Sequence, residues 1–185
     1  MDQVGKYACI ERERRFWVKE LPCELVVCSA RRITDKYLDN SRLRLRKVED
    51  DEGNIIALKL TQKYPLESAS PYHRLITNLY LNLSEFEQLA TLAGDTLIKQ
   101  RYRYNWQGFR FGIDVFVGKL SGLMLAEVEA PTDTELFSIP VPDFAFQEVT
   151  DNAFFTGGNL ARLTAAEFQQ AFQSGECSEG AAPSS

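Results

Sequence analysis

Basic residues alternate with other residues in three short segments of this 185-residue chain. They are Arg42, Arg44 and Arg46 in the first segment, Lys59 and Lys63 in the second, and Lys99, Arg101 and Arg103 in the third. Successive side chains of a β-strand point to opposite faces, so each set occupies a single face of its strand. Because Lys and Arg are strong donors to phosphate oxygens, these faces predict a binding wall for an anion that carries several phosphates.

Carboxylates show the same alternation in two other segments. Glu11 and Glu13 share a face with Arg15 near the N-terminus, and Glu127 and Glu129 share a face later in the chain. Hard divalent cations prefer oxygen ligands. Pairs of carboxylates on one strand face therefore predict a site for such a cation.

The separation of positive and negative strands is the informative feature of this pattern. A charged strand face is most often a face that water covers. A solvated face normally mixes the two signs, however, and like charges directly opposite each other on neighbouring strands destabilise a sheet. A bound polyphosphate and bound divalent cations would offset that repulsion, so the pattern favours a binding site.

Eight segments combine this alternation with the flanking turn residues of antiparallel strands. Eight such strands can close into a barrel that leaves no exposed edge. The sequence therefore predicts a mainly β (α+β) fold, a closed eight-stranded antiparallel β-barrel that forms a tunnel with a polar lumen and helices packed outside. The predicted strands cover approximately residues 6–18, 31–38, 42–48, 54–64, 72–83, 96–105, 109–117 and 123–130. Apolar residues of the opposite parity would face outward; they are Leu43, Leu45, Leu58, Leu60, Ile98 and Val128.

Turn and capping residues separate these segments. Residues 50–54 and 105–108 have the composition of hairpin turns. Ser84 and Glu87 form a predicted capping box for a helix over 84–93, and Thr164 and Glu167 form another. A proline at position 22 can begin a helix over 22–29.

The composition is that of a globular protein, with 44% hydrophobic and 25% charged residues. The length favours one domain over residues 1–173, and the Ser-, Gly- and Ala-rich residues 174–185 are expected to form a disordered tail. A net charge of −5 argues against nucleic acid or an anionic membrane as a partner. Because the sequence has no long apolar run and no signal-peptide core, we expect a cytoplasmic protein.

Six segments, in the same order, resemble the motifs of the CYTH domains, which are also called triphosphate tunnel metalloenzymes. Residues 10–16 (IERERRF) resemble the N-terminal Glu-x-Glu-x-Lys signature of that family. Residues 42–46 (RLRLR), 60–63 (LTQK) and 99–101 (KQR) resemble its basic strands, and residues 113–116 (IDVF) and 122–129 (GLMLAEVE) resemble its acidic segments. The resemblance covers about residues 7–163.

This resemblance implies a tunnel that binds a small-molecule triphosphate together with a divalent metal, Mg²⁺ or Mn²⁺. It implies metal binding by Glu11, Glu13, Glu127 and Glu129, with Asp114 as a further acidic member. It implies phosphate binding by Arg44, Arg46, Lys63, Lys99 and Arg101, to which strand parity adds Arg42, Lys59, Arg74 and Arg103. The candidate catalytic residues are Glu13, Arg15 and Glu129.

Two positions depart from the family pattern. Arg15 stands where the family has Lys, and a guanidinium does not readily give or take a proton. A mechanism in which that residue titrates therefore does not transfer to this chain. The middle strand has Arg74, Ile76 and Asn78 where the family often has acidic residues, so the carboxylate set is smaller.

The hypothesis that these residues favour is a divalent-metal-dependent triphosphatase that cleaves inorganic tripolyphosphate. Thiamine triphosphate hydrolysis and ATP cyclisation would use the same phosphate contacts, with Tyr37, Tyr80 or Phe116 as an aromatic platform. A protein that binds polyphosphate or nucleotide without turnover is a further alternative, to which the departure at Arg15 points. A barrel that carries an apolar ligand fits poorly with the charged lumen face.

Overall fold

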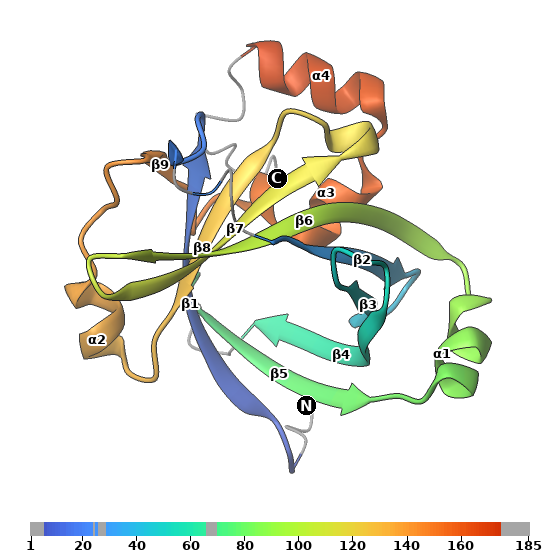
Figure 1. Cartoon of the computed structure of the whole chain (residues 1–185). Helices are drawn as coiled ribbons and strands as arrows, with labels where there is room; N and C mark the ends of the chain where they lie inside the picture. The colour runs from blue at the N-terminus through green and yellow to red at the C-terminus, as the bar shows by residue number, and fades with distance from the viewer. Residues whose placement is uncertain (1–5, 24, 26–28, 66–69, 175–185) are drawn as a thin grey trace, which may run out of the picture.

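The eight predicted strands form a closed antiparallel barrel (Figure 1). The structure is a computed structural model that describes residues 6–23, 25, 29–65 and 70–174. Within these residues the sheet has the strand order β5-β4-β3-β2-β6-β7-β8-β1-β9, and an additional pairing of β1 with β5 closes the ring. Because β9 pairs with β1 outside this ring, the barrel itself has eight strands. The predicted fold class is confirmed.

The barrel strands lie within a few residues of the predicted segments. They are β1 (Cys9–Val18), β2 (Arg31–Leu38), β3 (Leu43–Glu49), β4 (Ile55–Pro65), β5 (His73–Tyr80), β6 (Gly94–Trp106), β7 (Phe109–Val117) and β8 (Met124–Glu129), and β9 is Ala145–Glu148. The helices are α1 (Leu83–Ala90), α2 (Asp133–Ser138), α3 (Gly157–Arg162) and α4 (Ala165–Ser174), and the short 3-10 turns are η2 (Gly118–Leu120) and η3 (Ala153–Phe155).

Two tight turns fix the register of the basic strands. In the β3–β4 turn, Asp50 Oδ1 accepts hydrogen bonds from the backbone amides of Glu52 and Asn54 at 3.0 and 2.8 Å. In the β6–β7 turn, Gln107 and Gly108 have φ angles of 49° and 86°, as a two-residue hairpin loop requires. Both hairpin predictions are confirmed.

An apolar layer covers part of the outer face of the barrel beneath α2. Val128 of β8 belongs to this layer, as the outward parity predicted. The buried members of the layer are Phe16, Val18, Leu25, Trp106, Phe111, Ile113, Ala126, Val128, Leu136 and Ile139. Burial of each large side chain contributes about 1.5–3 kcal/mol, so this layer stabilises the β1, β7 and β8 wall.

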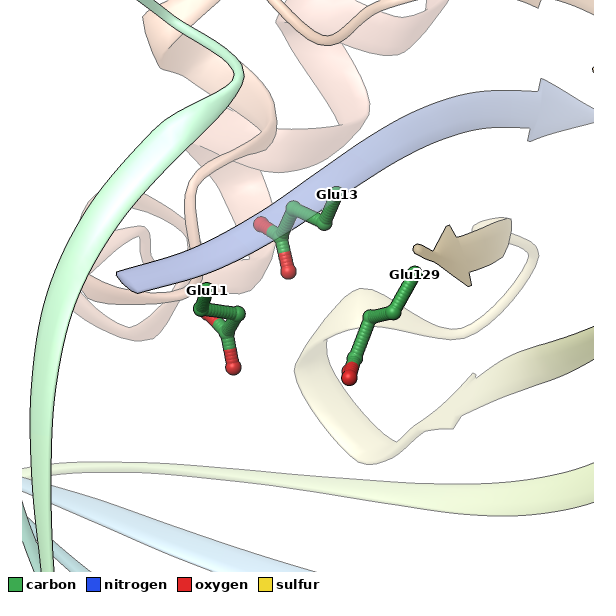
Figure 2. Close-up of side chains that lie close together, drawn as sticks. All are labelled: Glu11, Glu13 and Glu129. Atoms are coloured by element: carbon green, nitrogen blue, oxygen red, sulfur yellow. The ribbon is translucent and has the colours of Figure 1, made fainter. Parts of the chain in front are cut away.

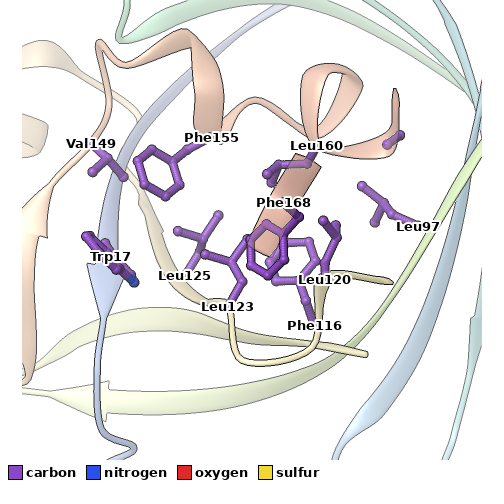
Figure 3. Packing of buried hydrophobic residues seen from close by; sticks show 11 residues of the cluster. Trp17, Leu97, Phe116, Leu120, Leu123, Leu125, Val149, Phe155, Leu160 and Phe168 are labelled. Atoms are coloured by element: carbon purple, nitrogen blue, oxygen red, sulfur yellow. The ribbon is translucent and has the colours of Figure 1, made fainter. Parts of the chain in front are cut away.

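A second apolar cluster lies at one end of the barrel, where η3, α3 and α4 cover it (Figure 3). Trp17, Leu97, Phe116 and Leu125 extend the lumen faces of four strands, and they pack with residues of the covering elements. The covering residues include Phe155, Leu160 and Phe168. The lumen is therefore polar in its middle, and its wall becomes apolar toward this covered end.

The helix predictions met different outcomes. The box at Thr164 and Glu167 is confirmed, because the Glu167 amide donates to Thr164 Oγ1 and the Thr164 amide donates to Glu167 Oε2. The box at Ser84 and Glu87 is wrong by two residues, since α1 is capped by Asn82 with Glu85. Asn82 has the same three-residue spacing to a glutamate, and Asn is at least as strong an N-cap as Ser.

Some predictions fall on residues that the structure does not describe. Half of the predicted helix over 22–29 and residues 175–185 of the predicted tail lie outside the described ranges, and the domain limits stay a prediction. Among the described residues, no helix has the length and apolar character needed to cross a membrane.

Candidate functional site

A cavity of about 540 Å³ lies in the barrel lumen, which is a usual volume for a small-molecule site. Six of the barrel strands contribute charged side chains to its wall, as the alternation of the sequence predicted. These are Glu11, Glu13, Arg15, Arg42, Arg44, Arg46, Lys63, Arg74, Lys99, Arg101, Glu127 and Glu129. The structure thus gathers on one lumen residues that are up to 118 positions apart, from 11 to 129.

Three carboxylates converge in this lumen (Figure 2). Glu11 and Glu13 extend from β1 and Glu129 extends from β8, and one oxygen of each lies within 4.8 Å of the others. Partial burial and the charges of Glu11 and Glu13 raise the pKa of Glu129. The Lys63 ammonium hydrogen-bonds to Glu11 and lies 3.5 Å from Glu13 Oε1. The cluster therefore already attracts one cation, and its donors are all hard oxygens.

Arg15 connects the two acidic strands. It donates from Nη2 to Glu13 Oε1 at 2.6 Å and from Nε to Glu127 Oε1 at 3.0 Å. Its third contact is from Nη1 to the Phe155 carbonyl oxygen at 3.2 Å. Burial disfavours the Arg15 cation, but Glu13 and Glu127 outweigh that effect and raise its pKa. Arg15 is thus a permanent cation that holds two glutamates in place.

Asp114 lies beneath the basic residues of β6 and not in the carboxylate cluster. Its side chain is 1% exposed and accepts hydrogen bonds from Lys99 Nζ at 2.5 Å and from Arg101 Nε and Nη2 at 2.6 Å each. Arg101 Nη2 also donates to Glu127 Oε2 at 2.5 Å. Burial lowers the pKa of Lys99 despite this carboxylate. Asp114 and Glu127 therefore both hold Arg101, and they lie outside the group that Glu11, Glu13 and Glu129 form.

A comparable buried pair positions the arginines of β3. Asp35 of β2 accepts hydrogen bonds from Arg46 Nε and Nη2 at 2.6 and 2.7 Å, and it lies 3.7 Å from Arg44 Nε. Although burial alone would raise the pKa of Asp35, the charges of Arg46 and Arg44 hold it well below its usual range. Among the described residues, Arg44 Nε is buried without a hydrogen-bond partner. This nitrogen instead faces Asp35 as an ion pair without a hydrogen bond.

The remaining predicted residues lie at the edges of the lumen or beyond it. Arg42 stacks on the Tyr64 ring, and Arg74 donates from Nη1 to the carbonyl oxygen of Ser70 at 3.3 Å. Lys59 and Arg103 have the predicted parity, but they do not line the lumen cavity. Lys59 lies over the Tyr80 ring, 4.8 Å from its centroid.

Sequence reasoning missed Asp35 and Gly112. Asp35 has the lumen parity of Tyr37, but its strand mixes both signs, so a search for single-sign strands passes over it. Gly112 faces Glu127 across the β7–β8 register, and a Cβ placed there would lie 3.4 Å from Arg101 Cδ and Nε. The absence of a side chain at Gly112 thus leaves a path for Arg101 to reach over β7 to Glu127.

We compared the sequence and the structure with those of known proteins. No model of a known protein family matches the sequence. An inorganic triphosphatase of Acetivibrio thermocellus is 32% identical over 72 residues, which are 39% of this chain and 45% of that protein. The match thus spans less than half the length of this relative.

Two solved structures match most of the chain. The crystal structure of the hypothetical protein NE1496 has a TM-score of 0.56 and 25% identity, and the match covers 83% of this chain and 99% of that one. The crystal structure of the inorganic triphosphatase NE1496 has a TM-score of 0.55 and 24% identity, with 82% and 93% covered. This chain has the triphosphate tunnel fold of the CYTH proteins. In this tunnel fold, the lumen has the three-carboxylate cluster on the β1 and β8 side and the basic residues of β3, β4 and β6 around it.

Proposed function

We propose that the protein hydrolyses a triphosphate compound, most simply inorganic tripolyphosphate, with the help of a divalent metal ion. One observation carries this proposal: a single cavity is lined by three converging carboxylates and by basic side chains from four other strands. The matched relative from Acetivibrio thermocellus is described as an inorganic triphosphatase, which supports the same substrate class. The partner is thus a small molecule, in accord with the acidic net charge of −5.

The carboxylate cluster fits Mg²⁺ or Mn²⁺. Glu11, Glu13 and Glu129 offer oxygen ligands within 4.8 Å of one another, and the raised pKa of Glu129 reflects negative charge that a cation would neutralise. A divalent ion held by these residues would neutralise phosphate charge and make a water molecule more acidic. Glu127 and Asp114 take a different part in this proposal, because both hold Arg101 and Asp114 also holds Lys99.

The basic residues would bind and orient the phosphates. Arg46 and Lys99 are held by Asp35 and Asp114, so their charges are in place before a ligand arrives. Preorganised donors of this kind stabilise the charge that develops during phosphoryl transfer. Arg44 also lines the cavity, where its guanidinium charge would attract a phosphate oxygen. The lumen thus favours a substrate with several adjacent negative charges.

Arg15 would act as a positioning residue and an electrostatic one. Its contacts with Glu13 and Glu127 fix the side chains on either side of the cluster. Because it stays charged at every physiological pH, it would not serve as the proton acceptor. The attacking water would instead have to lose its proton to solvent or to a carboxylate of the cluster.

The decisive experiment measures phosphate release from tripolyphosphate with and without Mg²⁺. We expect release by the wild type only with the metal, and a loss of at least about a hundredfold for Glu13→Gln, because the cluster loses a charged ligand. Glu87→Gln, an exposed residue of α1 that lines neither cavity, is the matched control and should keep wild-type activity. Equal release by the Glu13→Gln protein would remove the assigned role, and analysis of products from ATP and thiamine triphosphate would reveal a cyclase or a different triphosphatase.

A further inference from the structure

Three arginines lie on the lumen face of the barrel wall beyond the cavity just described. Arg31 of β2 is directly opposite Arg101 in the β2–β6 register, and Arg103 is the next residue of the same parity on β6. Arg110 of β7 is two residues from Gly112, which is opposite Arg103. Diagonal neighbours of this kind are about 7–8 Å apart, which long side chains can span. We call Arg31, Arg103 and Arg110 the outer arginine group.

The packing of the opposite face supports this orientation. Tyr102 and Tyr104 flank Arg103 in the sequence and pack against the apolar layer outside the barrel. Because alternate residues of a strand face opposite sides, Arg103 lies on the side of Arg101, inside the wall. A second cavity of about 640 Å³ is lined by Arg110 and Arg101 and also by the carboxylates Glu127, Glu129 and Glu135, whereas Arg31 and Arg103 do not line it. Arg110 therefore adjoins the lumen through Arg101, and strand register and parity place Arg103 and Arg31 next to these two arginines.

The three arginines of this group form no ion pair with the carboxylates of the described ranges. In the described residues, no carboxylate forms an ion pair with Arg31, Arg103 or Arg110, whereas Arg101 pairs with Asp114 and Glu127. Arg103 and Arg110 are exposed, and Arg31 is half-buried. Like charges directly opposite on neighbouring strands, such as Arg31 and Arg101, destabilise a sheet unless an anion lies between them.

The position of the group indicates which anion it suits. Toward the covered end of the barrel the lumen wall is apolar, with Leu97, Phe116 and Leu125, and this is a poor environment for phosphate. A linear polyanion that fills the lumen can therefore extend favourably toward the open end, where the β6–β7 hairpin and the outer arginine group lie. Arg101 stands between the two regions and contributes to both cavities.

We propose that the outer arginine group is a second phosphate-binding site, which binds the part of a linear polyphosphate chain that extends beyond a triphosphate unit in the lumen. This proposal rests on the proposed function for the position of that triphosphate unit. It gives the protein a wider ligand class than tripolyphosphate, namely longer linear polyphosphates. It also assigns a role to Arg103. This residue alternates with Lys99 and Arg101 along β6 but, unlike them, does not line the lumen cavity.

The test is a binding titration of the metal-free full chain with tripolyphosphate and with linear hexapolyphosphate. The wild type should bind hexapolyphosphate more tightly. Arg103→Ala should weaken hexapolyphosphate binding roughly tenfold, as expected for one lost charge-assisted contact, and should weaken tripolyphosphate binding by less. Arg32→Ala is the matched control, because Arg32 is exposed, adjacent to Arg31 and on the opposite face of β2; it should change both affinities by less than about twofold.

Three results would each overturn the proposal, two of them from the variants. One is an equal loss of affinity for both anions in Arg103→Ala, and the other is a loss in Arg32→Ala as large as that in Arg103→Ala. A wild type that binds the two anions equally would overturn it as well. Failure of the proposed hydrolysis is measured separately, by phosphate release with Mg²⁺, and it leaves the comparison of the two arginine variants intact.

Discussion

The substitution Asp114→Asn tests the buried charge network that holds the basic wall of the lumen. Asp114 is 1% exposed, and the Lys99 side chain that contacts it is 8% exposed. Removal of one partner from such a buried pair costs about 3–5 kcal/mol, because the other charge stays buried without compensation. For a chain of this length, that loss lowers the melting temperature by about 6–20 °C. The Arg101 charge loses less stabilisation than the Lys99 charge, because Arg101 keeps its hydrogen bond to Glu127.

The assay is thermal and urea unfolding of the metal-free proteins, followed by circular dichroism. Asp133→Asn is the matched control, because Asp133 forms an ion pair with Arg12 while its own side chain is 51% exposed, and water screens such a pair, so its loss should leave the stability close to that of the wild type. An Asp114→Asn protein that loses no more stability than this control would refute the assigned role of Asp114.

The pH dependence of the same variant provides a second check. Burial already holds the pKa of Lys99 below its usual value, and removal of Asp114 should lower it further. A lysine whose pKa is lower in the folded state than in the unfolded state destabilises the fold most strongly at a pH where both states carry the charge. This penalty disappears as the pH rises to the pKa of the unfolded state. The stability deficit of Asp114→Asn should therefore shrink as the pH rises toward the ordinary lysine pKa of about 10.4. A deficit that stays constant over this range would contradict the explanation.

Three further substitutions test other parts of the lumen. Glu129→Gln should abolish Mg²⁺-dependent phosphate release and yet stabilise the metal-free protein by up to about 1 kcal/mol in urea unfolding, because it relieves repulsion from Glu11 and Glu13; a less stable protein would contradict this. Asp35→Asn should destabilise by about 3–5 kcal/mol near neutral pH, because Arg46 loses its buried partner. The pKa of Asp35 is depressed in the fold, so its contribution is present above the unfolded pKa of about 3.9 and is lost as the pH falls below it; the gap between wild type and variant should narrow only in that acidic range. Arg15→Lys should cost about 1–3 kcal/mol in urea unfolding, since one ammonium cannot replace three separate guanidinium contacts, and an unchanged midpoint would show that these contacts do not contribute.

The alternation of residue types along single strands was sufficient to predict the barrel and most of its lumen. The side chain of every second residue faces the same side, so Arg44, Arg46 and Lys99 could be assigned to one surface without knowledge of the strand order. The hairpin turns could also be predicted, because the residues that permit a positive φ are adjacent in the sequence. The cap of α1 could not be distinguished as easily, since two overlapping segments satisfy the same local pattern.

The partners of the charged residues depended on tertiary structure. Sequence alone grouped Asp114 and Glu127 with the other acidic residues, whereas the register of β6, β7 and β8 brings them to Lys99 and Arg101. Asp35 has no local signal for its pairing with Arg46, because that contact joins two strands whose register is set by the whole barrel. Parity is a property of one strand, but Coulomb energy depends on the distance between strands. The sequence therefore determined most of the charges that face the lumen, and only the closed barrel decided which of them neutralise one another and which remain for a ligand.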